Sequence, residues 1–190
     1  DLLPTDIIKS DVIGSIKQAR QEAFTETWEE LEVETGRDGF AEVFGHIRMI
    51  YAKEKARRSL LEEFRERVIA KVGSAEDLVS KVVEPYTQAY LIAKHCQYVS
   101  TSNAAEINAL LKWLNRIDNS DWLPSAMKFL AEHENDAAYV HWFLRKLERL
   151  AACMHICGYD VNARIERYAT LLRALEKSHS MASSVAAVEL

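Results

Sequence analysis

The sequence predicts an all-α protein, an irregular bundle of about seven or eight helices with αα-hairpins as local units and no sheet. Apolar residues recur at helical spacing in nearly every segment, and no stretch alternates convincingly as a strand would. Only six Gly and three Pro interrupt the chain, which favours long helices over many short strands. Hydrophobic residues make up 48% and charged residues 28%, ordinary values for a globular protein.

Two helices are predicted before residue 37. Residues 4–14 begin with Pro-Thr-Asp, a helix-start signal, and end on a glycine. Residues 17–36 carry Phe24, Trp28 and Leu31 at helical spacing and also end on a glycine.

A long helix is predicted from Asp38. Residues at steps of about 100° form its apolar face: Phe40, Val43, Phe44, Ile47 and Tyr51. The stripe then meets charged residues and resumes about a quarter turn away, at Leu61, Phe64 and Val68. Either the helix kinks between Lys53 and Ser59 or two helices meet there.

The middle of the chain predicts three further helices. Ser74 caps the first, and Pro85 inside it predicts a kink near residues 82–84. Residues 104–117 are amphipathic, and Pro124 falls in the first turn of the helix that follows.

Two strong helices are predicted at Ala137–Cys157 and Val161–Leu175. Gly158 ends the first helix and Asp160 caps the second, so the two helices are predicted to form an αα-hairpin. We expect residues 1–176 to form one helical domain, and residues 177–190, small and polar, to form a flexible tail. The first residue is not Met, which indicates a fragment of a larger protein or a processed product.

The Cys-Met-His-Ile-Cys stretch near the end of the first of these helices invites interpretation as a metal site. On a helical wheel Cys153 and Cys157 lie about 40° apart on the apolar face, and His155 lies roughly on the opposite side. Three ligands so arranged cannot converge on a tetrahedral zinc ion. The favoured interpretation is two small core residues.

Other motifs are equally weak as catalytic signals. His95 and Cys96 are adjacent on a helix and do not face each other. The run from His133 to Asp136 lies at a helix junction, where capping residues are expected. The sequence has no HExxH, Walker A or GxGxxG motif. No catalytic residue, metal ligand or cofactor site is therefore predicted in this chain.

Three cysteines cannot build a disulfide framework, which favours the cytoplasm. No apolar run approaches the roughly 18–20 residues that cross a bilayer, and no signal peptide opens the chain, so a membrane partner is not expected.

Charge is distributed unevenly along the chain, whose net charge is −5. Residues 1–45 hold four Lys or Arg and eleven Asp or Glu, whereas residues 46–72 hold eight and four. The basic run supplies the candidates for contact with DNA phosphates: Arg48, Lys53, Lys55, Arg57 and Arg58. The alternative is that this run pairs with the acidic segment 29–34. The overall negative charge argues against broad nonspecific binding of DNA.

A second basic set lies in the last two helices: Arg145, Lys146, Arg149, Arg164 and Arg167. Because Glu148 and Glu166 are interleaved with these residues, the pattern favours ion pairs between helices.

Five stretches spread over most of residues 1–176 share an order and spacing with a known family: PTDIIKSDVIG, TWEELE, GRDGFAEVFGHIRMIYAKEKARRSLLEEF, VVEPYTQAY and FLRKLERLAACMHICGYDVNARIERYATLL. Together they resemble the helical part of the GmrSD family of phage-restriction nucleases, also called the domain of unknown function 262 family.

The resemblance implies three parts in the parent protein. These are a ParB-like domain that hydrolyses a nucleotide through an Asp-Gly-Gln-Gln-Arg-type motif, a helical region, and in many members an HNH nuclease domain. This sequence contains neither motif, so no catalytic residue carries over.

Two hypotheses of different kinds follow. In the first, the chain is a helical connector that joins the catalytic domains of its parent and contacts DNA through the basic run. In the second, it is a structural or oligomerisation module, with a second copy of the chain as a candidate partner in a homo-oligomer and no nucleic-acid contact. Enzymatic activity within this chain is not predicted.

Overall fold

The computed structural model describes residues 3–177, and every regular element in this range is helical. When π-helical turns are counted with the α-helices that they continue, there are eight helices. The predicted all-α class, the helix count and the lack of a strand in the described range are thereby confirmed. The predicted tail, apart from Lys177, lies outside the described residues.

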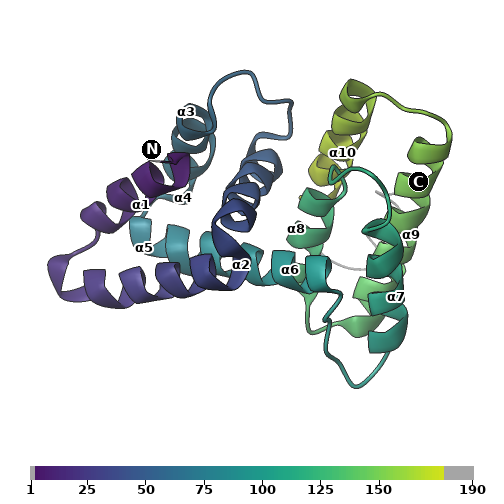
Figure 1. Cartoon of the computed structure of the whole chain (residues 1–190), viewed down its shortest axis with the longest axis horizontal. Coiled ribbons are helices and arrows are strands. Elements are labelled where there is room, and N and C mark those ends of the chain that lie inside the picture. The colour runs from purple at the N-terminus through teal and green to yellow at the C-terminus, as the bar shows by residue number, and fades with distance from the viewer. Residues whose placement is uncertain (1–2, 178–190) are drawn as a thin grey trace. The chain divides into compact units, whose positions relative to one another are not determined.

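The chain forms two compact units. Its amino-acid composition gave no sign of this division. Unit 1 consists of Asp1–Ala52 and Ala56–Gln88, and unit 2 consists of Lys53–Lys55 and Ala89–Leu190. In Figure 1 the colour of unit 1 runs from purple at Pro4 to teal at Leu78, and residues 104–175 of unit 2 run from teal to yellow.

Unit 1 begins with α1 (Pro4–Ser15) and α2 (Gln18–Ala52). As the start signal predicts, the Leu3 amide donates to Asp6 Oδ2 at 2.8 Å. Gly36 interrupts α2 with φ 71° and ψ 159°, so this element contains both predicted helices and the break between them. Its second half ends at Ala52, and a loop follows, as the shift of the apolar stripe indicated.

Two further helices follow, each with a π-helical turn, and the second begins in unit 1 and continues from Ala89 as part of unit 2. The first runs through α3 (Leu60–Phe64), a π turn (Arg65–Ile69) and α4 (Ala70–Val72). The second runs through α5 (Ala75–Leu78), a π turn (Val79–Val83) and α6 (Glu84–His95). Ser74 caps α5 by accepting from the Asp77 amide at 3.1 Å, as predicted. A kink was predicted near residues 82–84, and the structure has a wider π turn, Val79–Val83, just before Pro85.

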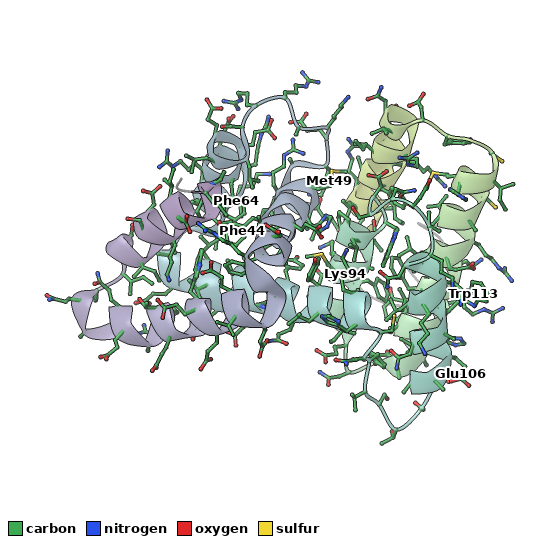
Figure 2. The ribbon with its side chains drawn as sticks, in the orientation of Figure 1. Phe44, Met49, Phe64, Lys94, Glu106 and Trp113 are labelled. Atoms are coloured by element: carbon green, nitrogen blue, oxygen red, sulfur yellow. The ribbon has the colours of Figure 1, made fainter. Side chains whose placement is uncertain are left out.

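An aromatic cluster forms the core of unit 1. Trp28 packs edge-on against Phe40, with ring centroids 5.7 Å apart, and Phe44 lies between Phe40 and Phe64 at 5.1 and 4.9 Å. Figure 2 shows Phe44 and Phe64 close together where α2 meets α3. Each of these rings is almost completely buried, which contributes about 1.5–3 kcal/mol per side chain. This cluster ties the helices on either side of the loop to each other.

Unit 2 contains α7 (Ala104–Leu114), α8 (Leu123–His133), α9 (Ala137–Ile156) and α10 (Val161–Leu175). Helix α9 packs against α7 and α8. At the α8 contact, Phe129 stacks on Phe143 with ring centroids 3.9 Å apart. The predicted turn between α9 and α10 is confirmed, because Gly158 has φ 67° and Asp160 accepts from the Ala163 amide at 3.0 Å. Helix α10 itself packs mainly on α8.

The prediction that both cysteines near the end of α9 belong to the core was wrong. Met154 is buried, but Cys153 and Cys157 are exposed. Met154 is the last buried residue of α9, and the chain turns at Gly158. Cys157 therefore lies beyond the part of the helix that packs against other helices. His155 lies next to the loop after α7, with its Nδ1 3.3 Å from Asp118 Oδ1.

Candidate functional site

The basic run predicted to contact DNA lies at the end of α2 and in the loop of residues 53–59. Lys53 opens the loop in a left-handed conformation with φ 52°. Ser59 closes it as the cap of α3, donating from its hydroxyl to Glu62 Oε2 at 2.6 Å. Hydrogen bonds from Ser59 lower the pKa of the Glu62 carboxyl. The loop is therefore anchored at its second end by a capping box.

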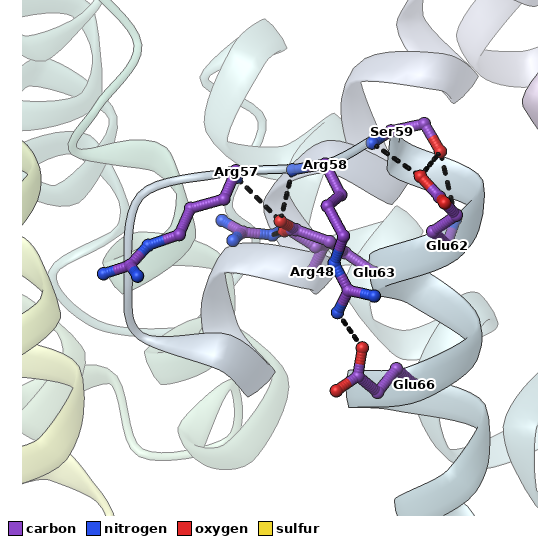
Figure 3. A network of polar contacts seen from close by, with 7 residues as sticks. All are labelled: Arg48, Arg57, Arg58, Ser59, Glu62, Glu63 and Glu66. Atoms are coloured by element: carbon purple, nitrogen blue, oxygen red, sulfur yellow. Dashed lines mark hydrogen bonds and ion pairs between the residues drawn. The ribbon is translucent and has the colours of Figure 1, made fainter.

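The carboxylate of Glu63 fixes the backbone of this loop. One oxygen accepts from the amide of Arg57 at 2.7 Å and from the amide of Arg58 at 2.8 Å. The other oxygen accepts from Arg48 Nε (Figure 3). Glu63 is 4% exposed, so three donors converge on a carboxylate that water barely reaches.

The charge state of Glu63 follows from these contacts. Burial by itself raises the pKa of the Glu63 carboxyl, because it penalises the charged form. The two loop amides and the guanidinium of Arg48 outweigh burial, and the pKa is lowered overall. Glu63 is thus an anion at neutral pH and holds the loop in its charged form.

Arg48 belongs to the interior of unit 1. Its side chain is 7% exposed and ion-paired to Glu63, although it was predicted to face a phosphate. Because its guanidinium balances a buried carboxylate, moving it to a ligand would leave that carboxylate uncompensated. The role of Arg48 visible in the structure is to hold the fold.

Arg57 and Arg58 project from the clamped backbone in unit 1, and both are exposed. Arg58 forms an ion pair with Glu66, one turn further along the same helix than Glu62. Figure 3 shows the Arg57 side chain pointing away from the Glu63 contacts. Within residues 3–177 no ion pair engages its guanidinium.

Lys53 and Lys55 lie in unit 2 and contact α10. The side chain of Lys53 is 12% exposed and its ammonium is paired with Glu176, and Arg173 Nη2 donates to the Lys53 carbonyl at 2.9 Å. Lys55 is exposed and donates to Asn162 Oδ1 at 2.7 Å. The ammonium of Lys53 is therefore mostly used within the fold, whereas the exposed ammonium of Lys55 has further N–H donors that a ligand could reach.

The alternative interpretation, that the basic run pairs with the acidic segment 29–34, named the wrong partners. The ion pairs of Arg48, Lys53 and Arg58 are with Glu63, Glu176 and Glu66. The acidic segment makes other contacts, with Lys9 Nζ 2.9 Å from Glu29 and Gln88 Nε2 3.3 Å from Glu34. Most of the basic run is therefore paired within the fold, as this interpretation held, but its acidic partners lie outside segment 29–34.

Ion pairs were expected for the second basic set, and the structure forms one at Arg164. Its Nε lies 2.7 Å from Asp121 Oδ2, and its Nη1 donates to the Tyr159 carbonyl at 2.7 Å. Arg145, Lys146 and Arg149 form no ion pair with the described part of the chain, although Glu148 is interleaved with them.

The clamp at Glu63 was not predicted from the sequence. The Ser-x-x-Glu spacing from Ser59 to Glu62 does mark the start of α3, and that signal was available. Nothing in the sequence separates Glu62, which completes the cap, from Glu63, which reaches back to the loop.

The described residues offer no cluster of three or more His, Cys, Asp or Glu side chains that could hold a metal ion. Asp136, in the His133–Asp136 run, caps α9 by accepting from the Tyr139 amide at 3.0 Å, the role expected for it. Of the helices described between residues 3 and 177, none has the length and apolar character needed to traverse a bilayer.

Comparison of the chain with protein-family models, with curated proteins and with solved structures finds no match. Arguments about function therefore depend on the residues and their geometry.

Proposed function

We propose that this chain is the helical connector of a GmrSD-like restriction nuclease, and that its 53–59 loop contacts DNA phosphates through Arg57 and Arg58. The observation that carries the contact is the Glu63 clamp. It fixes the backbone of two consecutive arginines and leaves the guanidinium of Arg57 exposed and without an ion pair in the described part of the chain.

A clamped loop suits a phosphate contact for a physical reason. An arginine on a fixed backbone loses less conformational entropy on binding than one on a mobile loop. Its guanidinium matches two phosphate oxygens with two parallel donors. Arg58 adds a second guanidinium in the same unit, shared with Glu66.

In this proposal Arg48 and Lys53 support the loop without touching DNA. The catalytic parts, a ParB-like nucleotide-hydrolysing domain and an HNH nuclease, belong to the parent protein. The resemblance in the helical segments supports that assignment, and a restriction nuclease would act in the cytoplasm.

The salt dependence of duplex DNA binding tests the contact. For the 190-residue chain, the plot of log K against log salt concentration loses about 0.9 of slope for each phosphate contact removed. Arg57→Ala should flatten the slope by about that amount, and Arg57→Ala with Arg58→Ala by up to about twice as much. The control is Arg20→Ala with Arg37→Ala, which removes two exposed charges elsewhere in unit 1. Equal slopes for the loop and control variants would refute the contact.

The second candidate function is a structural or oligomerisation module. The paired states of Arg48 and Lys53 favour it, because these charges already have partners within their own units. It predicts no measurable DNA binding and a mass that rises with protein concentration in sedimentation equilibrium. A monomer that binds DNA with a slope sensitive to Arg57 would exclude it.

A further inference from the structure

The outer face of helix α9 combines basic and aromatic side chains. The inner face of the helix is buried against α7 and α8 through residues such as Val140, Leu144 and Leu147. The opposite side carries basic and aromatic residues: His141, Trp142, Arg145, Lys146 and Arg149. Their side chains line one hollow of about 250 Å³.

The charges on this face are not neutralised by the described part of the chain. Glu148 follows Arg145 by three residues, a spacing at which ion pairs form on helices, yet no such pair is present. Arg164 shows the contrasting case, since it lies in the same unit and is held by Asp121. The α9 face therefore keeps its donors available to a partner.

The spacing of the basic residues fits a polyanionic strand. His141, Arg145 and Arg149 follow one another at intervals of four residues, so they span about 12 Å along the helix axis at about 1.5 Å per residue. Each strand of duplex DNA carries one phosphate per roughly 3.4 Å of helix axis, and an extended single strand spaces its phosphates more widely. A single strand lying along the helix would therefore still bring more than one phosphate within reach of this row.

Trp142 distinguishes a nucleic acid from an acidic polypeptide. Its ring lies between the basic residues and packs on Tyr139 at 5.7 Å with 26° between the planes, which holds the indole in place. Aromatic rings set among basic residues are how proteins bind single strands, with unpaired bases stacked on the rings and phosphates on the charges. An acidic peptide would use the charges but has no base to place on the ring.

We infer that the outer face of α9 is a second nucleic-acid contact, which takes a single-stranded segment. Arg145, Lys146 and Arg149 bind its phosphates, and Trp142 stacks on one base. This inference does not depend on the proposed loop contact, because it concerns unit 2 and uses none of the loop residues.

The experiment measures fluorescence anisotropy of an end-labelled 12-nucleotide oligo-dT with the 190-residue chain over a series of salt concentrations. Arg145→Ala with Arg149→Ala should weaken binding at least tenfold at low salt and flatten the log–log salt slope by about 1.4, since each single-strand contact contributes about 0.7. Trp142→Ala should weaken binding about fivefold or more and leave the slope unchanged, because it removes stacking and no charge.

Controls separate this surface from the loop and from net charge. Arg20→Ala with Arg37→Ala removes the same number of charges and should keep the parental slope. Arg57→Ala with Arg58→Ala should alter duplex binding and leave the effect of Trp142→Ala on oligo-dT in place. Circular dichroism checks that each variant is folded.

Two results would overturn the inference. One is an unchanged slope for the Arg145 and Arg149 variant that remains folded. The other is competition by poly-glutamate as strong as that by unlabelled oligo-dT together with no effect of Trp142→Ala, which would identify the face as a site for an acidic protein.

Discussion

Arg48 on α2 and Glu63 on α3 form a buried ion pair, and the same carboxylate holds the amides of Arg57 and Arg58. The pair thus links packing inside unit 1 to the order of a surface loop. A change at either residue should affect both the stability of the unit and the position of the loop arginines.

Replacing Glu63 should destabilise the protein far more than replacing its exposed neighbour. Glu63→Gln leaves the buried guanidinium of Arg48 without a counter-ion, which costs about 3–5 kcal/mol of unfolding free energy. Glu66→Gln breaks a half-exposed ion pair and should cost less than about 1 kcal/mol. Urea unfolding followed by circular dichroism measures both variants.

A double-mutant cycle tests whether the two residues act together. With Arg48→Met added to Glu63→Gln, the combined loss should be smaller than the total of the single losses by about 0.5–3 kcal/mol. Strictly additive losses, or similar small losses for Glu63→Gln and Glu66→Gln, would show that Arg48 and Glu63 are not energetically coupled in the folded chain.

Acid should weaken the loop clamp. The pKa of Glu63 is lower in the folded chain than its ordinary value, so the unfolded chain binds the proton more readily between those two values. The stabilisation that the Glu63 clamp gives the folded chain is therefore fully present above the ordinary carboxyl pKa. It is lost as the pH falls through the lower pKa that Glu63 has in the folded chain. Unfolding free energies measured from pH 7 down to pH 3 should decrease, and less steeply in Glu63→Gln.

The pH series needs a comparison within the same chain, because Asp6, Glu62 and Asp77 also have lowered pKa values from hydrogen bonds at helix starts or from nearby cations. Asp77→Asn should remove only part of the acid sensitivity. A Glu63→Gln variant with the parental pH dependence would assign the acid effect wholly to those other carboxylates.

The helices could be predicted from the sequence because their signals are local. The limits of Val161–Leu175 match the prediction to the residue, since a capping aspartate and a helical apolar pattern define them. Gly36 and Gly158 were recognised as helix ends for the same reason, and both have positive φ. The π turns were not predicted, because only the irregularity near Pro85 leaves a sequence signal.

The site was less predictable because burial depends on neighbours that are distant in sequence. A helical wheel gives the direction of Arg48 but does not show that Glu63 will meet it inside the unit. The same limit explains the second basic set. The interleaved glutamates led us to expect ion pairs between helices. Arg164 pairs instead with Asp121, and Arg145, Lys146 and Arg149 form no ion pair with the described part of the chain.

Gly158 should be essential to the turn between α9 and α10 for conformational reasons alone. It has φ 67°, and an added Cβ would meet no atom within 4 Å. Gly158→Ala should therefore cost about 1–2 kcal/mol through backbone strain without a clash. Gly45→Ala is the matched control, since Gly45 lies inside α2 with equally open surroundings and ordinary φ, and there alanine should stabilise by about 0.5–1 kcal/mol. Equal effects of the two substitutions on the unfolding free energy would contradict the strained turn.

The exposed cysteines at the end of α9 provide a direct check on which face of that helix is buried. A maleimide reagent should modify Cys153 and Cys157 rapidly in the folded chain and Cys96, which is only partly exposed, more slowly, as followed by mass spectrometry of the peptides. Serine at position 153 or 157 should change the unfolding free energy by less than about 0.5 kcal/mol, whereas Met154→Ala should cost about 2–5 kcal/mol. If instead Cys153 and Cys157 reacted only after unfolding, α9 would have to be rotated about its axis. That rotation would carry Arg145 and Arg149 toward the core and remove the surface on which the single-strand contact depends.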